Sequence, residues 1–285
     1  MSRRSMLGGM LGAPALAGAM LGAPGAALAA AAPARAVNPM PPPTSQARDL
    51  WLSLRARLDG QPTFWYVFGT EFLLVDGAAT PYNGRIVVMA SLVKSLGGGA
   101  YDLPYVETVG SVTPAGDYST QHRHPVSGEP ISVEVSDPLR LSLRVEPDGS
   151  LTQESRAANG TIARYSGYFW EAMPYGGARS AISKTDIFLN RPDGAVDTLT
   201  EISVLRTPAG ARASAGFVPA EGETITSRTV ANPERYGGKA AWTVGYYHGR
   251  KCRTADEMRR LMRPVDLEKH AAFFDAWQPW AKELG

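Results

Sequence analysis

Residues 139–156 read Leu-Arg-Leu-Ser-Leu-Arg-Val-Glu-Pro-Asp-Gly-Ser-Leu-Thr-Gln-Glu-Ser-Arg. In the first half, Leu or Val alternates with Arg, Ser or Glu, so that a strand over residues 139–145 has one apolar and one polar face. Pro147-Asp148-Gly149 is a turn sequence, because proline presets a turn conformation and glycine tolerates positive φ. A second strand, over residues 151–156, follows the turn. The stretch therefore predicts an antiparallel hairpin with one face against a core.

The same pattern of short strands and turns extends from residue 62 to residue 250. Residues 64–75 are apolar on both faces, which predicts a strand covered on both sides or one interrupted at Gly69. Further strands are predicted over residues 85–93, 103–109, 131–135, 161–170, 182–189, 198–206, 212–218, 224–230 and 241–247. Turn sequences separate many of them, among them Asp76-Gly77, Asn159-Gly160, Pro192-Asp193-Gly194 and Pro208-Ala209-Gly210. About twelve such strands predict an all-β, mainly antiparallel fold, a large curved sheet that closes into a barrel.

Helices are predicted at both ends of this β-rich region. Over residues 44–59, apolar side chains recur on one helical face, and Gly60 supplies a stop signal. Near the C-terminus, Thr254 and Glu257 form a capping box for a helix that ends at Pro264. A last helix is predicted over residues 266–276, with His270 on its exposed surface.

The composition is that of an ordinary globular protein. Of 285 residues, 44% are apolar and 20% are charged, which excludes disordered, collagen-like and coiled-coil proteins. Cys252 is the only cysteine, so the chain has no internal disulfide and no zinc site built from several thiolates. The sequence shows no internal repeat and no second core with its own linker. Residues 44–285 are therefore predicted to form a single domain.

The N-terminus has the layout of an export signal. Arg3-Arg4 precedes an Ala/Gly/Leu/Met run without charge until Arg35, and small-residue cleavage sites end at Ala29 and Ala36. The alternative, a transmembrane anchor, is disfavoured because prolines and glycines interrupt the run. The prediction is a twin-arginine signal over residues 1–36, a Pro-rich linker over residues 37–43, and a periplasmic or secreted protein.

Removal of the signal changes the charge balance. The remaining chain has 26 basic and 27 acidic residues, so the excess of positive charge belongs to residues 1–36. No Lys/Arg stripe remains to indicate nucleic-acid binding, and no transmembrane span is predicted after cleavage. Twin-arginine export delivers folded chains, some of them with cofactors, but the sequence identifies neither a cofactor nor an oligomeric state.

Residues 116–136 are similar to the first metal motif of cupins. In that arrangement His122 and His124 share one strand face, and Glu129 completes the metal shell. Ser136 replaces the final glycine of the motif, and the second cupin motif, which supplies a third histidine, is absent. The alternative is a tight turn, since His-Pro-Val-Ser-Gly-Glu at 124–129 is a turn sequence that joins two strands.

Three further motifs span most of the chain after the signal. They are Leu-Arg-x-x-Leu-Asp-Gly at 54–60, His-Pro-Val-Ser-Gly-Glu at 124–129 and Trp-Gln-Pro-Trp at 277–280. Together they resemble a family of uncharacterised exported proteins of bacteria and fungi, a domain of unknown function with twin-arginine signals. The resemblance implies a lipocalin-like β-barrel and no established activity. Because that family usually has asparagine where His124 stands, the resemblance does not imply a metal site.

Aromatic residues gather in several of the predicted strands. Alternation places Tyr168 and Trp170 on one face of residues 161–170, and Tyr165 and Phe169 on the other. Aromatic side chains that face into a barrel line an apolar pocket, whereas the alternative is ordinary core packing. The residues predicted to contact a ligand are Trp65, Trp170, Arg179, Trp242 and Tyr246.

Two functions from different classes fit these features. The first is an exported β-barrel that binds a hydrophobic or aromatic small molecule. The alternative is an enzyme on the same barrel, with or without a metal, in which His122, Tyr168 or Glu171 performs acid–base chemistry such as hydration, isomerisation or cyclisation. Glu171 is either a buried carboxylate with a raised pKa or a solvated acid paired with Arg179. A structural envelope protein is a third interpretation, and no nucleophile elbow, phosphate loop or dinucleotide fingerprint occurs.

Overall fold

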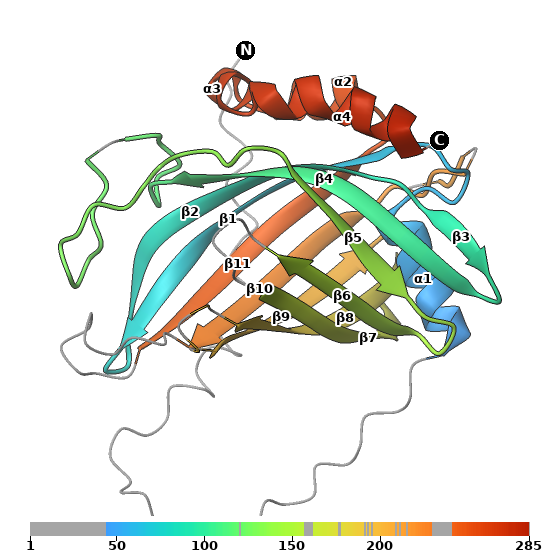
Figure 1. Cartoon of the computed structure of the whole chain (residues 1–285), viewed down its shortest axis with the longest axis horizontal. Helices are drawn as coiled ribbons and strands as arrows, with labels where there is room; N and C mark the ends of the chain where they lie inside the picture. Colours follow the sequence, from blue (N-terminus) through green and yellow to red (C-terminus); the bar gives the residue numbers. More distant parts are fainter. Residues whose placement is uncertain are drawn as a thin grey trace, which may run out of the picture.

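The computed structural model describes residues 44–284, except 120, 157–161, 176–177, 191, 193, 195, 209, 211, 215 and 230–240. The signal and linker predicted for residues 1–43, and the turn predicted at Asn159-Gly160, lie outside the described residues. Within them the chain forms one antiparallel sheet flanked by helices (Figure 1). No described helix is long and apolar enough to cross a membrane.

The sheet closes on itself. Its strands in the described residues are β1 (Thr63–Val75), β2 (Ala78–Ser91), β3 (Lys94–Gly97), β4 (Ala100–Val112), β5 (Leu139–Val145), β6 (Ser150–Arg156), β7 (Ile162–Tyr175), β8 (Ala178–Asn190), β9 (Val196–Arg206), β10 (Glu221–Thr229) and β11 (Ala241–Cys252). Each strand from β4 to β11 pairs with the next, β11 pairs with β1, and β1 pairs with β2. Because β2 also pairs with β4, the described strands make a closed ring of ten, with β3 a short flap on β4. The predicted all-β antiparallel barrel with flanking helices is confirmed.

Two of the predicted turn sequences, both fully described, reverse the chain between strands. Asp76 and Gly77 join β1 to β2 with φ values of 50° and 78°, the left-handed conformation of a two-residue hairpin. Gly149, with φ of 83°, turns β5 back toward β6, as the alternating stretch predicted. Along each strand alternate residues face the interior, so the hairpin registers fix which side chains meet there.

Two predicted strands do not form. Residues 131–135 make only an isolated bridge between Val135 and Gly110, and residues 212–218 make only one between Ser214 and Phe217. Both segments are loops that connect consecutive strands of the ring. The loop that contains residues 131–135 ends at Pro138, which has no N–H to donate to a β-ladder.

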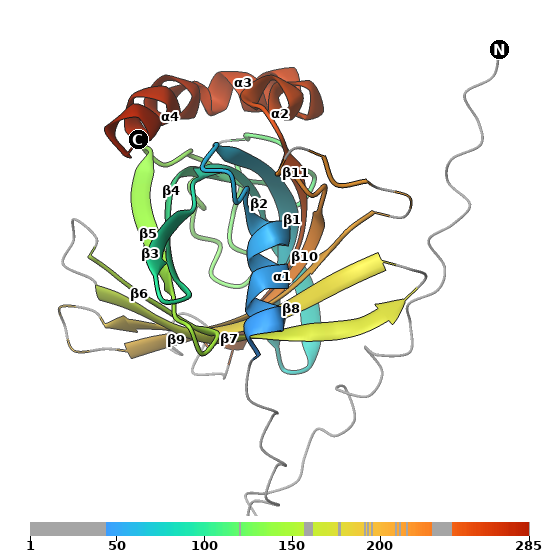
Figure 2. The same ribbon diagram turned by 90° about the vertical axis from the view of Figure 1, so that its right-hand side faces the viewer.

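Helix α1 (Ser45–Arg55) lies across one end of the barrel (Figure 2). Its start is capped by Thr44, whose hydroxyl accepts a hydrogen bond from the Ala47 N–H at 3.1 Å. Trp51, on the side of the helix that faces the interior, stacks on Phe169 of β7 with 4.4 Å between the ring centroids. The helix therefore closes this end of the ring with aromatic surface.

The end of α1 is set by a buried lysine. Lys251 of β11 donates hydrogen bonds to the main-chain oxygens of Ser53 and Ala56, both at 2.8 Å. An amine at this position satisfies carbonyls that the last turn of a helix leaves free. Burial lowers the pKa of Lys251 to about 7. The helix therefore ends at Arg55, a turn before the end predicted at residue 59.

Helices α2 (Ala255–Leu261), α3 (Pro264–Lys269) and α4 (Ala271–Leu284) lie along one outer face of the barrel (Figure 1). The predicted capping box forms, since the Thr254 hydroxyl accepts a hydrogen bond from the Glu257 N–H at 3.1 Å. Apolar helix side chains pack on the outward faces of β1, β2 and β4 in a cluster that includes Phe64, Ile86, Val88, Val106, Met258, Phe273 and Trp280. The helices thus explain why the first strand is apolar on both faces.

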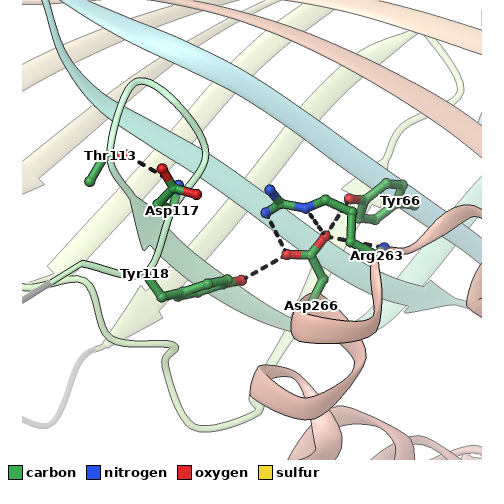
Figure 3. Close-up of polar contacts among 6 residues, drawn as sticks. All are labelled: Tyr66, Thr113, Asp117, Tyr118, Arg263 and Asp266. Carbon is green, nitrogen blue, oxygen red and sulfur yellow. Dashed lines mark hydrogen bonds and ion pairs between the residues drawn. The ribbon is translucent and has the colours of Figure 1, made fainter.

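Asp266, fully buried in α3, ties the helices to the barrel (Figure 3). Its Oδ2 accepts hydrogen bonds from Arg263 Nε at 2.8 Å and from the Tyr66 hydroxyl of β1 at 3.0 Å. Its Oδ1 accepts from Arg263 Nη2 at 2.7 Å and from the Tyr118 hydroxyl at 3.3 Å. Burial alone raises the pKa of Asp266, but Arg263 and Tyr66 hold it below its ordinary value. One carboxylate therefore joins α3, β1 and the loop after β4.

The prediction that His270 is exposed is wrong. The expected helix is divided at this residue into α3 and α4, and the side chain turns inward against β4, where it is fully buried. Its Nδ1 lies 2.7 Å from the Thr108 hydroxyl, and its Nε2 lies 3.0 Å from where a Cβ at Gly110 would stand. Burial lowers the pKa of His270 to about 4, although Asp266 opposes the shift.

This buried histidine makes stability depend on pH. An unfolded chain takes up the proton near pH 6.5, whereas the folded chain does so only near pH 4. Between these values the unfolded state binds more protons, so the free energy of unfolding falls as the pH drops. We expect His270 to account for a loss of about 2 kcal/mol between pH 7 and pH 5. Urea unfolding at both pH values measures it.

His270→Gln should reduce this difference between pH 7 and pH 5, whatever its effect on stability at either pH. Met258→Leu, which changes a buried residue without a titratable group in the same packing between helices and sheet, is the control and should leave the pH dependence as in the unmodified protein. An equal pH dependence in His270→Gln and the unmodified protein would show that His270 is not buried in its neutral form.

Candidate functional site

The barrel contains a cavity of about 410 Å³. Trp51 and Arg55 of α1 bound it at one end, and inward-facing residues of the ring form its wall. Most of that wall is apolar, with Trp65, Val67, Val87, Met89, Val109, Leu143, Leu151, Ile187, Leu199 and Leu205 among its residues. An apolar cavity of this size with a few polar groups is typical of a small-molecule site.

A first polar group in the barrel, the Glu71 cluster, consists of Glu71, Asn83, Arg85 and Tyr247. The Glu71 carboxylate accepts hydrogen bonds from Asn83 Nδ2 at 2.8 Å, from Arg85 Nε at 3.2 Å and from the Tyr247 hydroxyl at 2.9 Å. Burial raises the pKa of Glu71, but Arg85 and the other donors together bring it below its ordinary value. These donors satisfy the Glu71 carboxylate and keep it ionised.

Glycines make room for the Tyr247 ring in this cluster. A Cβ at Gly69 would lie 2.6 Å from the ring, and one at Gly245 would lie 2.4 Å from the hydroxyl. Both contacts are far too close, so the two positions require glycine for the ring to lie along the wall. Gly69 therefore does not interrupt β1; it lets Tyr247 reach Glu71.

A second polar group lines the same cavity but is not internally satisfied. Glu107 of β4 and Glu201 of β9 come from opposite sides of the ring and are here called the carboxylate pair. Glu201 accepts a hydrogen bond from Ser203 Oγ at 3.2 Å. Glu107 makes no hydrogen bond or ion pair within the described part of the chain. Both side chains are half-buried because they border the cavity.

Arg55 places a positive charge beside the carboxylate pair. It extends from the last turn of α1, with Nη2 3.4 Å from Met89 Sδ and its guanidinium 5.5 Å from the centre of the Trp65 ring. Among the described residues it forms no ion pair with either carboxylate. Its charge therefore acts through space, and its N–H groups retain capacity to bind a ligand.

Enclosure in the barrel shifts the protonation of the carboxylate pair. Burial raises the pKa of Glu107 to about 7, with Arg55 lowering it and Glu201 raising it further. Burial also raises the pKa of Glu201 above its ordinary value, against the effect of Arg55 and Ser203. Near neutral pH the cavity therefore contains a carboxyl group, Glu107, that gains and loses its proton, together with a second carboxyl group and a guanidinium. Such a set can donate and accept protons at an apolar ligand.

The residues predicted to bind a metal lie in the loop between β4 and β5, away from the cavity wall. His124 and Glu129 close a turn, in which the His124 N–H donates to the Glu129 main-chain oxygen at 2.8 Å. His124 Nδ1 accepts a hydrogen bond from the Ser127 N–H, and His122 is half-buried in the same loop. No group of three or more His, Cys, Asp or Glu side chains among the described residues is placed to hold a metal ion. Residues 124–129 therefore form the predicted turn.

The residues predicted to contact a ligand are divided by strand alternation. Trp65 lines the cavity. Trp242 and Tyr246 point outward and are nearly half exposed. Tyr168, predicted as a catalytic residue, is exposed to a similar degree, and Trp170 shares its outward face of β7. Tyr165 and Phe169, on the other face of β7, are the aromatics of this strand that turn inward. The predicted alternation holds, but the face that meets the cavity is the opposite one.

Glu171 and Arg179 lie near the β7–β8 hairpin. Glu171 pairs with Ala181 in the ladder, and its side chain lies outside the described part of the structure. Arg179 is exposed, and its N–H donates to the Thr207 hydroxyl at 3.1 Å. Arg179 is therefore at the surface near α1 and not in the cavity wall.

Sequence reasoning missed the carboxylate pair and Arg55. The signal was present, since Glu107 occupies the same alternate positions as Leu103, Tyr105 and Val109 in β4. Glu201 likewise alternates with Leu199 and Leu205.

Comparison of the chain with protein-family models, with curated proteins and with solved structures gave no match.

The protonation of Glu107 is directly measurable. In protein labelled with ¹³C at the Glu side-chain carboxyl, we expect the Glu107 resonance to titrate near pH 7. Glu201→Gln should lower this pKa by removing a nearby negative charge, and Arg55→Met should raise it by removing a positive one. Glu154→Gln, which alters an exposed ion pair with Arg164, should leave the titration of Glu107 unchanged. Titration of Glu107 at the ordinary glutamate value of about 4.3 would contradict the site described here.

Proposed function

We propose that the barrel binds one small molecule with a hydrophobic or aromatic body in its interior cavity. The observation that carries the proposal is a cavity of about 410 Å³ with apolar walls, bordered by Glu107, which has no hydrogen-bond partner among the described residues. A void costs packing energy, and an enclosed carboxyl group without a partner costs hydrogen bonds. A ligand with an apolar body and one polar group would fill the void and supply a hydrogen bond to Glu107.

The aromatic end of the cavity supports a planar or cyclic ligand. Trp51 and Trp65 are rigid side chains with little conformational freedom to lose on binding, and both border the cavity. The hydroxyls of Ser203 and Thr224, 2.8 Å apart on neighbouring strands, offer a further polar contact. A few polar groups in an apolar wall orient a ligand and select its chemistry.

The enzyme alternative on the same barrel needs acid–base groups at the cavity. His122 and Tyr168, two residues first considered for that role, lie in the β4–β5 loop and on the outer surface of β7. Neither borders the cavity. An acid–base function therefore depends on the carboxylate pair instead.

Binding is testable with N-phenyl-1-naphthylamine, an uncharged aromatic dye that fluoresces in apolar surroundings. We expect saturable binding, with energy transfer from tryptophan because Trp51 and Trp65 border the cavity. Thr224→Trp places a large side chain in the cavity and should weaken binding about tenfold or more, equivalent to about 1.4 kcal/mol. Fluorescence titration gives the dissociation constants.

The matched control is Ile225→Trp. Ile225 is the next residue of β10, points outward and is 48% exposed, so this variant adds the same side chain outside the barrel. Its affinity should equal that of the unmodified protein. Val87→Phe, in another part of the wall, is a second cavity variant in case Thr224→Trp is unstable in thermal unfolding. Equal affinities in inward and outward variants would place the dye elsewhere and refute the proposal.

We further propose that residues 1–36 direct twin-arginine export to the periplasm or the medium. The support is Arg3-Arg4 before a weakly apolar run and small residues at the candidate cleavage sites. Exchange of both arginines for lysine should leave the chain inside the cell with its signal. N-terminal sequencing of the exported protein should begin after Ala29 or Ala36. Unchanged export of the lysine variant would refute the twin-arginine route.

A further inference from the structure

We propose that Glu107 and Glu201 are the acid and the base of an enolisation, which converts a bound apolar ketone to its enol between opposite walls of the barrel. The inference rests on the binding function proposed above. It adds a substrate class, carbonyl compounds with a hydrogen on the neighbouring carbon, and a reaction that needs only proton transfer.

The positions of the two carboxyl groups carry the proposal. Glu107 projects from β4 and Glu201 from β9, five strands apart in the closed ring of ten, and both border one cavity. A ligand that fills this cavity touches both walls. Glu107 has no hydrogen-bond partner among the described residues, so its carboxyl group is available to such a ligand. Glu201 has only the Ser203 hydroxyl at 3.2 Å as a described partner.

Glu71 shows by contrast how a carboxylate without a chemical role is held in this barrel. Three donors, Asn83, Arg85 and Tyr247, satisfy its oxygens, and its pKa is lowered. A carboxylate bound in this way is a poor proton acceptor and has little capacity left for a ligand. The carboxylate pair differs from Glu71 in both respects, although all three groups lie inside the same ring of strands.

The surroundings of the two groups assign their roles. Burial raises the pKa of Glu107 to about 7, so Glu107 is the acid, while Glu201, which accepts a hydrogen bond from the Ser203 hydroxyl, is the base. The charged or titratable groups that line the cavity with Glu107 are Arg55, Arg85, Tyr105, Tyr165, Glu201 and Tyr247. The positive charge of Arg55 lowers the pKa of Glu107. It therefore stabilises the carboxylate that forms when Glu107 donates its proton.

The proton transfer balances without an added reactant. The Glu201 carboxylate removes a proton from the carbon next to the carbonyl, and the electron pair of the broken C–H bond forms the C=C bond. The carbonyl π pair moves to oxygen, which takes the proton from Glu107. The products are the enol, protonated Glu201 and ionised Glu107, and the reverse transfer restores the ketone. Return of the Glu201 proton to a different carbon of a conjugated enol shifts a double bond, which is an isomerisation.

Exchange of the C2 protons of 1-tetralone tests this step. This aromatic ketone has hydrogens on one carbon next to its carbonyl, so loss of their ¹H NMR signal in D₂O reports enolisation directly. We expect the full-length protein to accelerate the exchange, and Glu107→Gln or Glu201→Gln to slow it by on the order of 10²-fold. Glu154→Gln, which alters an exposed ion pair with Arg164, should leave the rate unchanged. The rate should fall above about pH 7, as Glu107 loses its proton.

Binding of 1-tetralone is measured in parallel by quenching of tryptophan fluorescence, and the glutamine variants should retain it. Binding without faster exchange than in the Glu107→Gln/Glu201→Gln double variant overturns the acid–base proposal and leaves the binding function intact. Absence of 1-tetralone binding, with no displacement of the naphthylamine dye, overturns the binding function for this class of ligand and the enolisation with it. Exchange that is fast and equal in all variants places the chemistry outside the carboxylate pair and also overturns the proposal.

Discussion

Everything in this structure depends on the pairing of β2 with β4, which closes the sheet into a ring of ten strands. A ring of about eight strands is just wide enough for its inward side chains to fill. Two additional strands widen the interior beyond what those side chains occupy. Trp51 of α1, stacked on Phe169, fills one end. The remaining space is the cavity, which is therefore a consequence of strand number.

The two faces of the sheet are used differently around the ring. Where α2, α3 and α4 cover the outside, at β1, β2 and β4, the strands bury apolar side chains on both faces. On the uncovered side, aromatic residues such as Tyr168 and Tyr246 point outward and half exposed. Three glutamate side chains, Glu71, Glu107 and Glu201, lie inside the ring, where burial of a charge is unfavourable unless hydrogen-bond or ion-pair partners compensate for it. Glu71 has such partners, whereas the carboxylate pair has few. Buried ionisable groups with few partners are concentrated at the functional sites of proteins.

The sequence contained most of the fold but little of the site. Alternation at residues 139–145 and glycine-containing turns predicted the hairpins because both depend on local chemistry. The missing strands at 131–135 and 212–218, and the buried His270, depended on how distant segments pack, which no local pattern reveals. Strand alternation also separated Tyr165 from Tyr168 correctly. It was the closure of the ring that decided which of these two faces the interior, and hence that Glu107 borders the cavity.

The account holds that the interior of the ring is a ligand site, and native mass spectrometry of the protein purified from its own cells tests this most directly. The account predicts a defined additional mass on the unmodified protein, retained by Ile225→Trp and lost from Thr224→Trp, because only the latter fills the cavity. The same additional mass on both tryptophan variants would place the ligand outside the barrel and contradict the account.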